Sequence, residues 1–205
     1  MIDPFGRQIT YLRLSVTDRC DLRCVYCMPE HMEFLPKSDV LSLEELQRLC
    51  GTFVGLGVRK IRLTGGEPLV RRDVMTLIGA LGKMVRTGDL DEVTLTTNGT
   101  QLERFAADLA DCGVKRINVS MDSLHPDVFH RVTRGGDLPA VIRGIELARA
   151  LGMDVKVNAV ALRGVNDREF DDLLSWCGER GVDLCLIETM PMGDVADRGG
   201  SIFTA

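Results

Sequence analysis

Residues 11–27 read YLRLSVTDRCDLRCVYC, a stretch in which an alternating β-type run leads directly into three closely spaced cysteines. Successive side chains of a strand point to opposite faces, so a period of two separates the side chains of residues 11–17 into two sets. The apolar set is Leu12, Leu14 and Val16, and the polar set is Arg13, Ser15 and Thr17. The opening strand therefore has one apolar and one polar face, and a cysteine loop follows its carboxyl end.

Beyond this loop the chain alternates helix-period stretches with short β-rich runs, a pattern typical of parallel βα units. We predict strands at 11–17, 60–64, 93–97, 116–120, 155–161 and 184–188. We predict helices at 43–56, 74–86, 102–111, 138–151 and 169–180. Ser42 and Glu45 form a capping box, and a glycine closely follows the end of each helix.

The first five predicted strands all carry one apolar and one polar face. Parallel strands covered on both faces usually form continuous hydrophobic runs, and buried polar groups without partners cost about 1–3 kcal/mol each. We therefore expect helices on the apolar face and a wet surface on the polar face. A closed barrel would fill its interior with Val, Ile and Leu. The expected fold class is α/β, a partial, open TIM-like (β/α)6 barrel with parallel strands; a flat doubly wound sheet is the alternative.

Composition and charge narrow the classes of function. The chain has 205 residues, is 45% hydrophobic and 27% charged, and carries a formal net charge of −5. This balance argues against broad electrostatic binding of nucleic acid or an anionic membrane. The chain lacks a run of about 18 apolar residues and a signal-peptide pattern, so we expect a cytoplasmic protein. Residues 1–193 are expected to form the barrel, and residues 194–205 a loop.

The cysteines are distributed unevenly. Four of the seven, Cys50, Cys112, Cys177 and Cys185, are scattered among apolar residues and are expected to pack there. Cys20, Cys24 and Cys27 lie within eight residues, at the strand end where parallel α/β folds build their sites. Three thiolates are one ligand short of a closed zinc site, although a zinc loop stays an alternative. In a [4Fe–4S] cluster, three cysteine ligands leave one iron open to a small molecule.

The spacing Cys-x3-Cys-x2-Cys, with an aromatic residue before the last cysteine, resembles the signature of the radical S-adenosylmethionine (SAM) superfamily. The resemblance implies that Cys20, Cys24 and Cys27 ligate a [4Fe–4S] cluster, that the open iron binds SAM, and that cleavage of SAM yields a 5′-deoxyadenosyl radical. Residues 64–68, TGGEP, resemble the motif that binds the SAM ammonium. The implied SAM-binding residues are Tyr26, Gly66, Ser120 and Met190. Taken alone, Asn98-Gly99 would be a turn and Met190 a core residue.

Within that superfamily the chain resembles the N-terminal part of the GTP 3′,8-cyclase family of molybdenum cofactor (molybdopterin) biosynthesis. The resemblance rests on residues 11–20, 23–29, 62–68, 96–99 and 118–124. It implies a lyase in which hydrogen abstraction from the ribose C3′ of GTP precedes attack on guanine C8, with GTP bound by Arg13, Arg62, Thr96 and Lys156. The radical step needs no side-chain acid or base, so no catalytic residue is assigned.

The polar strand faces point to an anion independently of this resemblance. Arg13, Arg62 and Lys156 all lie on them, and charges are costly to leave unpaired in an interior. A triphosphate would satisfy the three cations. The alternative partners are internal carboxylates such as Glu67 or Glu188.

The resemblance also implies partners and two departures. We expect an electron donor and a downstream pterin-forming enzyme, and a homodimer stays open. Asp21 stands where relatives more often have Asn, which should change capping of the loop and the potential of the cluster but not ligation. The family's second, C-terminal cluster has no ligands in this sequence, so we expect a core that holds one cluster and SAM but is incomplete for GTP conversion. The alternative functions are another radical SAM enzyme such as a peptide maturase, and a metal-bound binding module without turnover.

Overall fold

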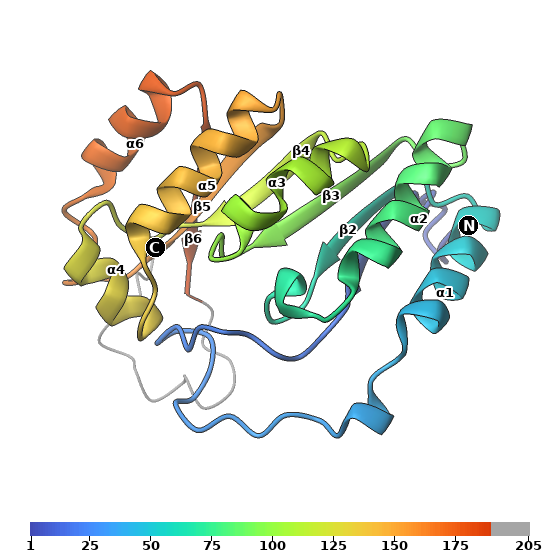
Figure 1. The fold of residues 1–205 in the computed structure, drawn as a ribbon, viewed down its shortest axis with the longest axis horizontal. Coiled ribbons are helices and arrows are strands. Elements are labelled where there is room, and N and C mark those ends of the chain that lie inside the picture. Colours follow the sequence, from blue (N-terminus) through green and yellow to red (C-terminus); the bar gives the residue numbers. More distant parts are fainter. Residues whose placement is uncertain (190–205) are drawn as a thin grey trace.

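The computed structural model describes residues 1–189, in which six parallel strands alternate with helices (Figure 1). The strands are β1 (Tyr11–Ser15), β2 (Lys60–Thr64), β3 (Glu92–Thr97), β4 (Arg116–Ser120), β5 (Asp154–Ala161) and β6 (Asp183–Glu188). The helices are α1 (Leu43–Gly55), α2 (Val74–Thr87), α3 (Leu102–Asp111), α4 (Pro126–Thr133), α5 (Leu138–Ala150) and α6 (Phe170–Glu179). Two short 3-10 helices, Lys37–Asp39 and Pro68–Val70, precede α1 and α2.

The strands lie in the sheet in their sequence order, β1-β2-β3-β4-β5-β6, and every neighbouring pair is parallel. A doubly wound sheet reverses its strand order at a switch point. The consecutive order therefore excludes the flat alternative and confirms the predicted open, partial (β/α)6 barrel. In Figure 1 the helices gather along one side of the sheet, as right-handed crossovers between neighbouring strands require.

The hydrophobic core lies between these helices and the apolar strand faces. Strand residues on that side are almost fully buried: Ile61, Leu63, Val93, Leu95, Ile117, Val119 and Val157. Each helix contributes a buried stripe, such as Leu77, Ile78 and Leu81 of α2. The polar residues of the same strands consequently face the other side of the sheet, which is the inner side of the barrel.

The predicted boundaries differ from the structure at two informative places. The first strand ends at Ser15 rather than residue 17, because the regular ladder stops there: the Val16 carbonyl accepts from the Arg71 side chain, and the Gly66 N–H bonds to the Thr17 carbonyl (2.7 Å) instead. The helix α4 was not predicted. Its sequence signal was Pro126, a residue favoured in the first turn of a helix, within a run of only eight residues.

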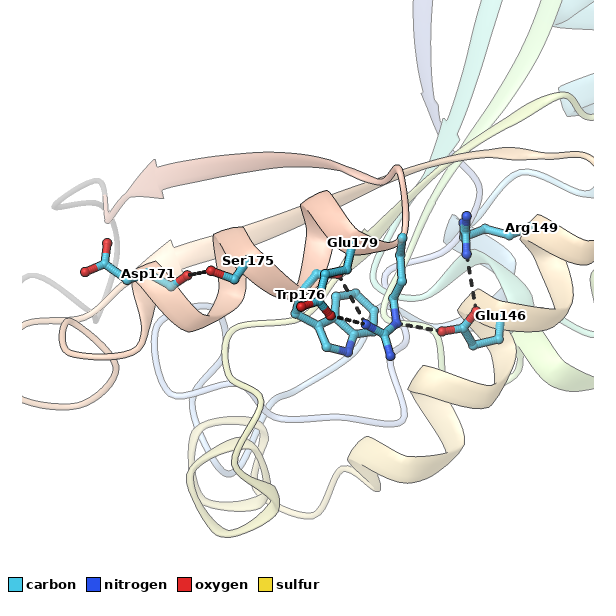
Figure 2. Close-up of polar contacts among 7 residues, drawn as sticks. Glu146, Arg149, Asp171, Ser175, Trp176 and Glu179 are labelled. Atoms are coloured by element: carbon cyan, nitrogen blue, oxygen red, sulfur yellow. Dashed lines mark hydrogen bonds and ion pairs between the residues drawn. The ribbon is translucent and has the colours of Figure 1, made fainter.

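An ion-pair cluster joins the outer helices α5 and α6 (Figure 2). The Arg180 guanidinium donates to Glu146 Oε1 (2.8 Å) and stacks over the Trp176 ring at 4.4 Å. Arg149 Nη1 also donates to Glu146, on Oε2 (3.3 Å). Because these side chains are only partly buried, we assign them a modest role in fixing α6 against α5. No helix within residues 1–189 is long and apolar enough to cross a bilayer.

Candidate functional site

The cysteine loop, residues 18–36, leaves β1 and is tied to the end of α4. Two backbone hydrogen bonds make this connection, Arg23 N–H to the Thr133 carbonyl (3.1 Å) and Val25 N–H to the Val132 carbonyl (2.9 Å). Arg134, which ends α4 in a left-handed conformation (φ 53°), donates from Nη1 to the Arg23 carbonyl (3.2 Å). A segment that follows β1 is thus positioned by a helix that follows β4.

Gly65 and Gly66 allow the start of the cysteine loop to pass directly against the end of β2. A Cβ on Gly65 would lie 2.5 Å from the Thr17 carbonyl oxygen, and one on Gly66 would lie 2.3 Å from the Arg19 carbonyl oxygen. The protein's own backbone next to Cys20 therefore lies directly against this glycine pair. The Gly66 N–H is bonded to the Thr17 carbonyl, so the Gly66 carbonyl is the backbone group of this residue that can still accept a hydrogen bond.

Glu67 connects the loops after β2 and β3, a role that sequence reasoning missed. Its fully buried carboxylate accepts hydrogen bonds from Leu69 N–H (2.9 Å), Thr97 Oγ1 (2.9 Å) and Asn98 N–H (2.6 Å). Burial raises the pKa of Glu67 to about 7, although the hydrogen bonds from Asn98 and Leu69 oppose this shift. Its place in the TGGEP motif was the only signal in the sequence.

The Asn98 side chain links the loop after β3 to the first cysteine. Its Nδ2 lies 3.6 Å from Cys20 Sγ and donates to Asp21 Oδ1 (2.7 Å). Thr100 Oγ1 donates to the other oxygen of Asp21 (2.6 Å). The Leu22 N–H also approaches Cys20 Sγ, at 3.4 Å. Two N–H groups from different segments therefore surround the Cys20 sulfur.

Tyr26 fixes the far end of the cysteine motif to the end of β4. Its hydroxyl donates to Asp122 Oδ2 (2.8 Å), while Asp122 Oδ1 accepts from Val160 N–H (2.8 Å). Burial raises the pKa of Asp122 to about 6 and the pKa of Tyr26 well above its usual range. The loop after β1, the end of β4 and the end of β5 are thereby held together.

The three thiols suit an iron–sulfur cluster by the chemistry of the donor set. Burial raises the pKa of Cys20 and Cys27, and raises that of Cys24 to about 12, so the thiolate forms need a compensating cation. A bound metal centre supplies that charge and deprotonates its thiol ligands. Among residues 1–189, no three His, Cys, Asp or Glu side chains are already gathered as a metal site.

The predicted GTP-binding cations occupy neighbouring positions on the inner face. Arg13 lies directly opposite Arg62 across the β1–β2 ladder. Arg62 donates from Nε to Thr94 Oγ1 (3.1 Å) and lies 5.6 Å from the Tyr11 ring centroid, so it has no carboxylate partner among the described residues. Within residues 1–189, the side chains of Arg13 and Lys156 form no hydrogen bond or ion pair. The inner face therefore carries three cations that no carboxylate of this described part neutralises.

Register places the other predicted ligands along the same face. Thr96 is opposite Asn118, which is opposite Lys156, and Ser120 at the end of β4 is opposite Asn158. Met190 and residues 194–205 lie outside the described residues.

The two carboxylates considered as alternative partners for the cations do not serve in that role. The Glu67 carboxylate accepts hydrogen bonds from Leu69, Thr97 and Asn98 instead. Glu188 is opposite Ala161, on the helix-facing side of the sheet. Neither pairs with Arg13, Arg62 or Lys156 in the described part of the chain.

A cavity of about 620 Å³ opens beside the start of the cysteine loop. Its lining includes Thr17, Asp18, Arg19 and Arg71, but none of the predicted SAM or GTP residues. Arg71 donates from its two terminal nitrogens to the carbonyls of Val16 and Leu41. Its guanidinium therefore holds the wall of this cavity in place.

Comparison with known proteins gives one family match and close relatives by sequence. Residues 14–177 match the family model described as the Radical SAM superfamily. The chain is 64% identical over 195 residues to GTP 3′,8-cyclase of Rhizobium meliloti (strain 1021), and 63% identical to that of Brucella canis. These alignments cover 95% of this chain and 56% and 57% of the relatives, so the chain spans about half the length of the curated relatives it matches.

Solved structures share the fold at low sequence identity. Streptococcus suis SuiB bound to its precursor peptide SuiA aligns with a TM-score of 0.75 at 19% identity, over 89% of this chain and 40% of SuiB. The protein anSMEcpe with bound AdoMet aligns with a TM-score of 0.71 at 18% identity, over 89% of this chain and 52% of that protein. At such identities the likeness concerns the fold alone.

Proposed function

The chain belongs to the radical SAM superfamily, and from this premise we propose that it is the cluster- and nucleotide-binding core of a GTP 3′,8-cyclase. Membership of the family implies a [4Fe–4S] cluster and SAM. We assign the cluster to Cys20, Cys24 and Cys27. When bound, these groups supply an electron and the 5′-deoxyadenosyl radical. The chain itself therefore needs only to bind and orient the cofactors and the substrate and to shield them from water.

The SAM-binding residues that we propose lie at the carboxyl edge of the sheet. Tyr26 is held within the cysteine motif by Asp122, which places it between the loop and β4. Gly66 presents its carbonyl toward a ligand ammonium, and Ser120 lies half-buried at the end of β4. Met190 is the fourth SAM-binding residue that we propose. It is assigned by the resemblance alone, because it lies outside the described residues.

The observation that carries the choice of GTP is the pair of facing guanidiniums. Like charges directly opposite each other on neighbouring strands are destabilising, and no carboxylate among the described residues separates Arg13 from Arg62. A triphosphate would neutralise both, because guanidinium groups bind phosphate oxygens in bidentate fashion, and Lys156 would add a point charge. We assign Thr96, on the same face, as the fourth contact to GTP.

Equilibrium binding of GTP to the chain tests this assignment. We expect Arg13→Glu, Arg62→Glu and Lys156→Glu each to weaken GTP binding by about tenfold or more, because each replaces an attraction by a repulsion. Arg104→Glu is the matched control, since Arg104 lies exposed on the outer helix α3, and it should leave the Kd within about twofold.

Unchanged GTP affinity in all three inner-face variants would reject GTP as the ligand of this face. Binding of a peptide that survives the same three reversals would favour a maturase-type substrate instead. SuiB, which has the same fold, is described with a bound precursor peptide, but its fold does not select between the two substrates.

A further inference from the structure

The Asn98 amide lies between a sulfur of the cysteine motif and a carboxylate. Its Nδ2 group is 3.6 Å from Cys20 Sγ and 2.7 Å from Asp21 Oδ1, so its two hydrogens can serve both acceptors. These contacts join residues that are 78 and 77 positions apart in the sequence. A local turn residue after β3 thus reaches the loop that follows β1.

The orientation of this amide is determined by its other contacts. Asn98 Oδ1 accepts from Thr100 N–H (3.0 Å) and lies 2.8 Å from Thr100 Oγ1. The Asn98 backbone N–H is held by Glu67 Oε2 (2.6 Å). Rotating the amide by half a turn would place its oxygen against the Asp21 carboxylate and would remove the acceptor for Thr100. The NH2 group therefore faces Cys20.

We propose that Asn98 is a positioning residue for the Cys20 thiolate and that Asn98 and Asp21 set the reduction potential of the cluster through opposing effects. This inference rests on the proposed function, because it requires a cluster on Cys20. Hydrogen bonds to cluster sulfurs and the net charge nearby are established determinants of the potential. The Asn98 N–H stabilises the more negative, reduced cluster, whereas the Asp21 carboxylate destabilises it.

The two effects can be separated because Asp21→Asn preserves the hydrogen-bond network. The oxygen of the new amide can accept from Asn98 Nδ2, and its nitrogen can donate to Thr100 Oγ1. Thr100 can then donate its own proton to Asn98 Oδ1, which is already 2.8 Å away. This variant removes the charge and leaves the amide of Asn98 in place.

The test is a redox titration of the anaerobically reconstituted chain, followed by the electron paramagnetic resonance signal of the reduced cluster. Asn98→Ala should move the midpoint potential in the negative direction, and Asp21→Asn should move it in the positive direction. Each shift should correspond to a roughly two- to tenfold change in the ratio of reduced to oxidised cluster, where tenfold is about 59 mV for one electron.

Asp111→Asn is the matched control for the loss of one carboxylate. Asp111 is exposed at the end of α3, which is the opposite edge of the sheet from the cysteine loop because α3 runs antiparallel to the strands. The midpoint potential of this variant should equal that of the unaltered chain. A merely structural role for Asn98 and Asp21 would alter iron content or unfolding without shifts of opposite sign.

The possible results separate the two hypotheses. If the unaltered chain assembles no cluster, the proposed function fails. If clusters form and the two variants shift in the same direction, or match Asp111→Asn, the inference on Asn98 and Asp21 is wrong while the cluster assignment stands. Should Asn98→Ala retain no iron, Asn98→Ser replaces it in the comparison, because the shorter hydroxyl keeps an acceptor for Thr100 N–H but cannot reach Cys20.

Discussion

At the scale of single residues, buried polar side chains hold together the loops at the carboxyl edge of the sheet, where the cysteine loop lies. Glu67 collects three donors from the loops after β2 and β3, and Asp122 collects Tyr26 and Val160. Both carboxyls have a raised pKa because burial disfavours their charged forms. Their hydrogen bonds offset the cost of burial, so the positions of the loops depend on a few buried side chains.

Glu67 should make stability depend on pH in a defined direction. Its pKa is about 7 in the folded chain against 4.5 for the ordinary carboxyl, so the folded state keeps its proton where the unfolded state has lost it. The free energy of unfolding should therefore fall as pH rises from about 4.5 to about 7, by roughly 3 kcal/mol from this group. Urea unfolding of the unaltered chain and of Glu67→Gln, across that range, measures the difference.

The difference between these two proteins should shrink or change sign across the pH window, because the amide introduced by Glu67→Gln does not titrate. The exposed residue Glu33 offers the control, and Glu33→Gln should run parallel to the unaltered chain. A difference between the unaltered chain and Glu67→Gln that stays constant with pH would show that Glu67 is ionised at the same pH in both states.

At the scale of elements, close backbone contacts position the helices around the sheet. The helix α2 passes the end of α3 so closely that a Cβ on Gly82 would lie 2.0 Å from the Cys112 carbonyl oxygen. On the other flank, the cluster around Arg180 and Glu146 connects α6 to α5 (Figure 2). The first contact depends on the absence of a side chain, and the second on charge, so they respond to different substitutions.

Gly82→Ala and Gly51→Ala should have opposite effects on stability. The new methyl group at position 82 meets backbone that cannot rotate away, so we expect a loss of about 1–3 kcal/mol. At position 51, inside α1, the nearest heavy atom is the flexible end of Met84 at 4.0 Å, and alanine should stabilise the helix by about 0.5–1 kcal/mol. Urea unfolding checks both, and changes of equal sign would contradict the packing argument.

At the scale of the whole molecule, the sheet carries its unpaired cations on the inner face and the cysteine loop at its carboxyl edge. The chain has a net charge of −5, yet its inner strand face presents Arg13, Arg62 and Lys156 without carboxylate partners among the described residues. The cysteine loop lies at the carboxyl edge of the same sheet, anchored to elements that follow β2, β3 and β4. A nucleotide bound to the inner face would therefore lie beside a cluster at the edge.

Iron binding should depend on the cysteine triplet alone. After anaerobic reconstitution we expect about four iron atoms per chain, and close to none in Cys20→Ala, Cys24→Ala or Cys27→Ala, because each removes one of the three proposed thiolate ligands. Cys112→Ala, far from the loop at the end of α3, should keep the full iron content. Iron and sulfide analysis measures both, and a colourless, zinc-loaded chain would contradict the cluster assignment.

The architecture could be predicted from the amino-acid sequence, since strand alternation, helix periodicity and capping are local signals. They were sufficient to predict six parallel strands, an inner polar face and a cysteine loop at its edge, and the resemblance in the motifs identified the superfamily. The short helix α4 could not be predicted, because eight residues carry little periodic signal. Its end nevertheless anchors the cysteine loop.

The side chains that support the site, in contrast, are brought together by the tertiary fold. Tyr26 meets Asp122 across 96 residues of sequence, and Asn98 meets Cys20 across 78. No local pattern encodes such pairs, because they exist only once neighbouring parallel strands bring their carboxyl ends to one edge. The same physics explains Gly66: its place in the TGGEP motif implied only a SAM-binding position, and the fold determined that the segment leading into Cys20 passes directly against it.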